Sequence, residues 1–147
     1  MGETGLQMSI DIEAPPERVW DTTIDIERWP EWTPTVRRAR RLDSGPLGVG
    51  SRVRIDQPKL PPTVWVVDAL EPRRMMTLKS GVPGMRVIAH HRLEPKGKGC
   101  ALTLSLRFEG LFGGLLARWT RDLNHRYLAI EAGGLKRHCE TRRSAGV

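Results

Sequence analysis

Apolar and polar residues alternate from Met8 to Glu13, the pattern of a strand that buries one face. The proline-rich residues 14–17 follow, where a proline beside an acidic residue favours the start of a helix. A second short helix or turn is expected over residues 25–32. The next extended segments are separated by short turns, which favour antiparallel neighbours. These predicted strands cover residues 36–42, 51–57, 63–70, 75–80, 85–93 and 101–109.

The last third of the chain changes to a helical period, from about residue 112 to residue 140. Large apolar residues recur there at steps of three and four, so they share one face of a helix. This face predicts a long helix packed on the concave side of the sheet. Gly133 and Gly134 interrupt the pattern, and both a kink and close backbone packing against the sheet would explain them. The face consists of Phe112, Leu115, Leu116, Trp119, Leu123, Tyr127 and Ile130.

Three segments of this sequence resemble a known family. The first is Ile12-Glu13-Ala14-Pro15-Pro16-Glu17-Arg18-Val19-Trp20. The second is Trp29-Pro30-Glu31-Trp32, followed by Pro34 and Val36. The third is Gly99-Cys100-Ala101-Leu102-Thr103, continued by the helix through Leu135, Lys136 and Glu140. Together they resemble the START-like superfamily (SRPBCC, helix-grip or Bet v 1-like), and within it most the bacterial polyketide cyclase/dehydrase family, which often has threonine where Cys100 stands.

The resemblance implies an α+β helix-grip fold. Its elements are a curved antiparallel sheet of about seven strands wrapped around a long C-terminal helix, with two short helices after the first strand. We expect one such domain over residues 6–141, with flexible termini at 1–5 and 142–147. Related proteins include lipid-transfer domains, plant hormone receptors, quinone-binding proteins and aromatic cyclases, so the fold alone does not identify a ligand.

A formal net charge of +7 raises the question of an anionic partner. The arginines are spread along the chain, and no aromatic residue is interleaved with the densest cluster, residues 37–41. The sequence has no zinc-finger spacing, no RNP-like segment and no evident helix-turn-helix. These observations argue against a nucleic-acid partner. Peripheral contact with an anionic membrane remains open, and the protein can be a monomer or a homodimer.

No apolar run approaches the roughly 18 to 20 residues that span a bilayer, and no signal peptide is evident at the N-terminus. We therefore expect a cytoplasmic protein. Cys100 and Cys139 stand alone, which predicts buried thiols. His90 and His91 should point to opposite faces of one strand, so they cannot hold a metal ion together. We expect neither a metal nor a cofactor.

A binding pocket is predicted between the inner face of the sheet and the helix. His91 falls among apolar inward positions, where its imidazole could bind or protonate a ligand carbonyl, or simply lie in the core. Trp119 and Tyr127 each combine an apolar body with a polar group on the predicted inward face of the helix. The expected pocket residues are Trp29, Trp32, Trp65, Val67, Met76, Leu78, Ala89, His91, Leu104, Leu106, Trp119, Leu123 and Tyr127.

Three functions are compatible with the sequence. The first is binding of a small or medium apolar ligand, such as a lipid, a quinone or a polyketide-like aromatic. The second, which rests mainly on the resemblance, is a cyclase or dehydratase in which His91 and Tyr127 supply acid–base catalysis. The third is an arginine-driven binder of nucleic acid or anionic membrane, whose affinity would fall steeply with salt.

Overall fold

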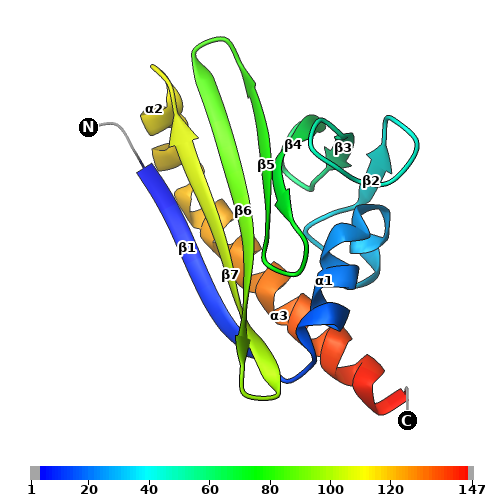
Figure 1. Cartoon of the computed structure of the whole chain (residues 1–147). Coiled ribbons are helices and arrows are strands. Elements are labelled where there is room, and N and C mark those ends of the chain that lie inside the picture. The colour runs from blue at the N-terminus through cyan, green and yellow to red at the C-terminus, as the bar shows by residue number, and fades with distance from the viewer. Residues whose placement is uncertain (1–3, 146–147) are drawn as a thin grey trace.

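In the computed structural model, which describes residues 4–145, seven antiparallel strands form one curved sheet against a long C-terminal helix (Figure 1). This is the predicted α+β architecture. The strand order is β1-β7-β6-β5-β4-β3-β2, so the first and last strands of the chain pair side by side. The elements are β1 (Thr4–Ile12), α1 (Pro16–Ile24), the 3-10 helix η1 (Ile26–Glu31), β2 (Arg38–Arg41), β3 (Arg52–Asp56), β4 (Thr63–Glu71), β5 (Met75–Val82), β6 (Met85–Lys96), β7 (Gly99–Glu109), α2 (Gly113–Trp119) and α3 (Arg121–Ala145).

The strands follow the alternation of apolar residues. In β7, Leu102, Leu104 and Phe108 are buried, while Thr103 between them is only half-buried. All sheet neighbours are antiparallel, as the short turns predicted. The turn between β5 and β6 uses Gly84 at φ +88°, a backbone conformation that favours glycine.

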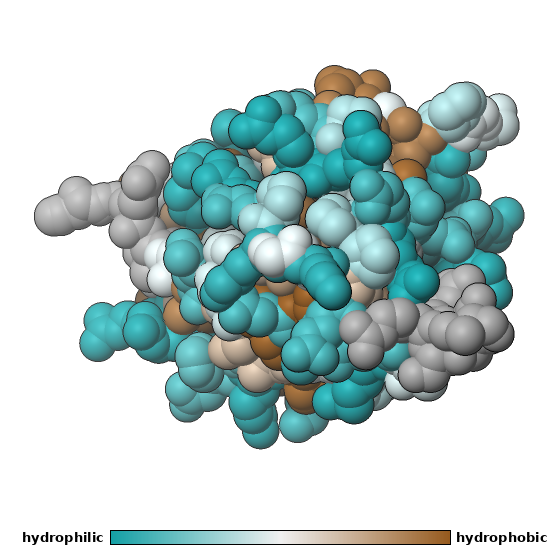
Figure 2. Space-filling view, turned by 60° about the horizontal axis from the view of Figure 1, so that its bottom comes forward, coloured by the Kyte–Doolittle hydropathy of each residue, from teal (hydrophilic) through white to brown (hydrophobic). Residues whose placement is uncertain are grey.

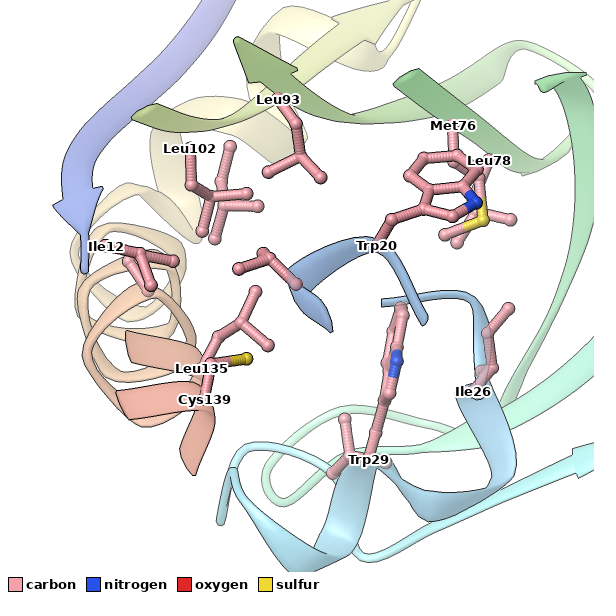
Figure 3. Close-up of a cluster of buried hydrophobic side chains, with 14 of the residues drawn as sticks. Ile12, Trp20, Ile26, Trp29, Met76, Leu78, Leu93, Leu102, Leu135 and Cys139 are labelled. Atoms are coloured by element: carbon pink, nitrogen blue, oxygen red, sulfur yellow. The ribbon is translucent and has the colours of Figure 1, made fainter. Parts of the chain in front are cut away.

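The closed hydrophobic core occupies the end of the sheet that α1 covers. Figure 3 shows Leu135 and Cys139 of α3 pointing toward Trp20 of α1, with Ile12 and Leu102 of the sheet on the same side. All five side chains are almost completely buried. This end of the molecule is filled by side chains, so a ligand site has to lie toward the other end of the sheet.

The C-terminal helix is divided at Thr120, and not at the two glycines. The Thr120 hydroxyl donates to the Leu116 carbonyl at 2.7 Å, a local bond that bends helices. The helix α3 continues through Gly133 and Gly134. A Cβ atom on Gly134 would lie 2.2 Å from the Trp32 carbonyl oxygen, so close backbone packing explains this glycine, with the segment after η1 as the neighbour in place of the predicted sheet.

The terminal elements run past the predicted domain limits, since β1 begins at Thr4 and α3 ends at Ala145. The predicted flexible termini lie partly outside the described residues, at 1–3 and 146–147. Between residues 4 and 145, no helix combines the length and the apolar character that crossing a bilayer demands. Both cysteines are buried, as the sequence predicted.

Candidate ligand-binding site

A cavity of about 530 Å³ lies between the sheet and the helices α2 and α3. Strands β3 to β7 supply most of its wall, and the loop between β3 and β4 adds Leu60, Pro61 and Pro62. Phe108 and Leu116 close it at the α2 end, and Trp29 and Val36 border it at the core end. The volume and the mainly apolar lining are those of a site for a small organic molecule.

Eight of the predicted pocket residues line this cavity. Six of them lie on β4 to β7, and His90, which was predicted to point to the other face of its strand, borders the cavity as well. Val67 and Met76 lie instead in the closed core, each with at most 1% of its surface exposed. Trp32 borders a separate, polar groove beside α1. The eight are Trp29, Trp65, Leu78, Ala89, His91, Leu104, Leu106 and Tyr127.

The predicted inward orientation of Trp119 is wrong. This side chain is 81% exposed, and Phe112 and Leu115 are each 53% exposed. Leu123 is half-buried but does not border the cavity. The bend at Thr120 ends α2, so one continuous apolar stripe does not run along both helices.

The inward face of α2 and α3 is narrower and more polar than predicted. Near the cavity it combines polar residues with Leu116 and Leu128, and near the core it is apolar. The sequence prediction chose the helix face with the largest apolar side chains, and that face lies beside the inward one. The inward residues are Leu116, Ala117, Thr120, Asn124, Tyr127, Leu128, Glu131, Ala132, Leu135 and Cys139.

Glu131 is the functional candidate that the sequence analysis missed. Its carboxyl borders the cavity and accepts a hydrogen bond from the Thr35 hydroxyl at 3.1 Å. The Thr35 hydroxyl is also 2.8 Å from that of Thr33, and both threonines are 1% exposed. Burial raises the pKa of Glu131 to about 7, against the opposing effect of the Thr35 bond. Near neutral pH the cavity therefore holds a carboxyl that is protonated in a large fraction of molecules.

The helical spacing contains a signal for Glu131. Leu128, Leu135 and Cys139 are buried in α3 at steps of seven and four. Glu131 lies three residues after Leu128 and four before Leu135, so it shares their face. A carboxyl in line with three buried apolar residues indicates an inward acid.

His91 is buried, with 8% of its surface exposed, and borders the cavity. Its ring lies 5.5 Å from that of Trp29, measured between centroids. Its Nδ1 atom is buried without a hydrogen-bond partner among residues 4–145. Burial, and to a smaller extent the neighbouring His90, lower the pKa of His91 to about 4, so the ring is neutral at physiological pH. A buried ring nitrogen without a partner is available for a polar group of a ligand.

His90 has a different setting. Its Nδ1 atom lies 2.9 Å from the Thr77 hydroxyl. Burial lowers its pKa, and the charges of Arg107 and Arg92 add to this effect. No group of three or more potential metal ligands occurs within residues 4–145, so the two histidines are not part of such a cluster.

Three further polar side chains border the cavity from the helices. Asn124 donates through Nδ2 to the Thr120 hydroxyl at 2.9 Å, a bond across the junction of α2 and α3. The Tyr127 hydroxyl donates to the Pro58 carbonyl, which ties α3 to the loop between β3 and β4. The proton of Tyr127 is thus already engaged, which distinguishes Tyr127 from Glu131 and His91.

Known proteins of similar structure share this architecture at low sequence identity. An aromatase/cyclase from Streptomyces sp. R1128, named Zhui, is 15% identical with a TM-score of 0.77, over 95% of each chain. Norcoclaurine synthase from Thalictrum flavum, in complex with a transition state analogue, is 12% identical with a TM-score of 0.76, over 97% of this chain and 98% of that chain. The protein TTHA0849 from Thermus thermophilus is 20% identical with a TM-score of 0.74, over 95% of this chain and 99% of that chain.

No curated protein sequence matches this chain significantly. The family described as polyketide cyclase / dehydrase and lipid transport matches residues 3–140. This range includes all seven strands, both short helices and the cavity-lining part of α3. The chain belongs to the polyketide cyclase/dehydrase and lipid transport family.

Proposed function

We propose that the protein binds a small or medium-sized apolar molecule that carries at least one polar group, such as a lipid, a quinone or a polyketide-like aromatic. The observation that carries this proposal is the cavity of about 530 Å³, whose mostly apolar wall contains two titratable groups, the half-buried Glu131 and the buried His91. An apolar wall favours the body of the ligand through burial of its surface. The two polar groups favour a ligand whose carbonyl or hydroxyl satisfies them.

Glu131 and His91 differ in what they offer such a ligand. A protonated Glu131 donates a hydrogen bond, which suits a carbonyl oxygen. The neutral His91 ring can accept or donate at Nδ1, depending on which ring nitrogen carries the proton. A hydroxy-ketone or a quinone matches this set of groups better than a plain hydrocarbon. A carboxylate ligand is disfavoured, because its charge would enter a cavity that already contains a carboxyl.

We expect Ala89→Phe to weaken the binding of an apolar probe. Ala89 is paired in the sheet with Leu78 and Leu106, and all three line the cavity. A phenyl ring at this position would occupy space that the ligand needs, so affinity should fall at least about tenfold. Titration with Nile red, an uncharged apolar dye, followed by its fluorescence, measures the effect.

The matched control is Ala101→Phe. Ala101 lies on β7 opposite Asp11 and Glu94, two exposed residues, and does not border the cavity. The Ala101→Phe variant should bind the probe with unchanged affinity. If Ala89→Phe folds normally and binds the probe as well as the wild type does, the ligand site lies elsewhere.

A second candidate function is acid–base conversion of the bound molecule. The observation that favours it is the pair of cavity groups whose pKa values burial shifts in opposite directions. Near neutral pH this leaves a neutral imidazole as a base and a protonated carboxyl as an acid, a combination typical of catalytic sites. In a dehydration, the base would take a proton from carbon while the acid protonates the departing hydroxyl, which leaves as water.

Glu131→Gln separates the two functions. Glutamine keeps the shape and can still bond to Thr35, so probe affinity should stay within about twofold of the wild-type value. Conversion of a β-hydroxyketone test substrate should fall by about a hundredfold or more if Glu131 is the acid. Equal conversion by wild type and variant would remove Glu131 from the chemistry. If the wild type does not convert the substrate, only the binding function remains.

A further inference from the structure

Four large apolar side chains are exposed together around α2. We call this set the α2 face: Leu111 is 85% exposed, Trp119 81%, and Phe112 and Leu115 53% each. Leu115 and Trp119 are four residues apart and so lie on one side of α2, and Leu111 and Phe112 directly precede this helix. Most of the face shown in Figure 2 is hydrophilic. A cluster of large exposed apolar residues marks an interaction site.

The α2 face is part of the folded structure. The Phe112 N–H donates to the Gly84 carbonyl at 2.9 Å, which ties the start of α2 to the turn between β5 and β6. On the opposite side of the helix, Gly113 and Ala117 are buried. Gly113 packs so closely on Phe108 that a Cβ atom would lie 3.2 Å from its carbonyl carbon. These contacts fix the orientation of α2 and direct its apolar side chains outward.

The charges around the α2 face are predominantly positive. Residues 110–130 contain three arginines, Arg118, Arg121 and Arg126, against one acidic residue, Asp122. All three arginines are exposed, and none forms an ion pair within residues 4–145. An anionic surface complements them. A second copy of the chain would bring like charges together, which disfavours this face as a dimer interface.

The α2 face also adjoins the cavity. Leu116 and Thr120, on the neighbouring side of the same helix, line the cavity wall. An apolar surface next to the wall of an apolar cavity suits a ligand that is itself dissolved in lipid.

We propose that the α2 face is a docking surface for an anionic lipid bilayer. The four side chains of the α2 face would enter the interfacial region of the bilayer, where tryptophan is favoured. Arg118 and Arg121 would lie at the level of the anionic headgroups. Docking requires no molecule in the cavity, so it can hold or fail independently of the proposed binding function.

Sedimentation with vesicles tests the proposal on the full-length protein. We expect binding at low ionic strength to vesicles of phosphatidylcholine mixed with phosphatidylserine, and much weaker binding to phosphatidylcholine alone. Trp119→Ala should weaken the binding by on the order of tenfold, through loss of buried apolar surface. Arg118→Gln combined with Arg121→Gln should weaken it by about fivefold for each charge removed. Both variants change exposed residues, and circular dichroism should show an unchanged fold.

Matched controls distinguish vesicle binding by the α2 face from attraction by the net charge and from nonspecific hydrophobic binding. Val49→Ala removes an apolar side chain that is 70% exposed in the loop between β2 and β3. Arg38→Gln with Arg40→Gln removes two exposed charges on β2, at the opposite edge of the sheet from β1 and β7, on which α2 packs (Figure 1). Both controls should bind vesicles like the wild type.

Three results would overturn the proposal. One is an absence of binding to anionic vesicles at low ionic strength. Another is equal weakening by both pairs of arginine changes, which would indicate diffuse attraction by the net charge. The third is a dimer in sedimentation velocity that Trp119→Ala dissociates, which would assign the α2 face to a second copy of the chain.

Discussion

Replacing Glu131 with glutamine should stabilise the folded protein by about 3 kcal/mol above pH 7, and by nothing below the ordinary carboxyl pKa of 4.5. The folded-state pKa of about 7 lies above the unfolded value, because burial disfavours the charged form. The favourable contribution of the wild-type carboxyl is therefore complete below pH 4.5. It is lost as the pH rises through 7, where ionisation of Glu131 favours unfolding. Glutamine does not ionise and avoids this loss.

His91 has the opposite dependence. Its folded-state pKa of about 4 lies below the ordinary value of 6.5. Its contribution to stability is therefore complete above pH 6.5 and is lost as the pH falls through 4. Between pH 4.5 and 6.5 the pH dependences of the two groups oppose each other. The free energy of unfolding of the wild type therefore changes little with pH in this range.

Urea unfolding at a series of pH values measures these effects. The free energy of unfolding of Glu131→Gln should rise with pH between 4 and 6.5, because only the His91 effect remains. That of His91→Phe should fall between 4.5 and 7, because only the Glu131 effect remains. Parallel curves for Glu131→Gln and the wild type would contradict the burial of an ionisable Glu131 in the cavity.

The sheet could be predicted from the sequence because its signals are local. Alternation of apolar residues along β7 identifies the buried face without knowledge of any other strand. Glycine and proline turns then fix the number of strands and their antiparallel order. Cavity residues such as Ala89 and Leu104 follow from the same alternation, since one face of each strand points inward.

The helices could not be predicted as well, because their orientation depends on what lies beneath them. Side-chain bulk placed Trp119 inside, yet the helix wall of the cavity is formed largely by small and polar residues such as Thr120 and Asn124. The other error is the prediction that the pocket is lined by Trp32, Val67 and Met76. The sequence does not indicate where the closed core ends and the cavity begins.

Gly134→Ala should destabilise the protein by about 3 kcal/mol, although alanine is the better helix former. The added Cβ atom would lie 2.2 Å from the Trp32 carbonyl oxygen, a backbone atom that cannot rotate away. Either α3 or the segment after η1 must move. That movement would disturb two neighbours on the same elements, Trp29 and Glu131, which both border the cavity.

Gly133→Ala is the matched control, one position earlier in the same helix. There the new Cβ atom would meet only the end of the Arg137 side chain, at 3.2 Å, and this side chain can shift. We expect a stability within about 1 kcal/mol of the wild type, or slightly higher because of the gain in helix propensity. Urea unfolding compares the two variants directly. Equal stabilities would mean that the contact of Gly134 with Trp32 yields without cost, and that α3 is not held against η1 at this point.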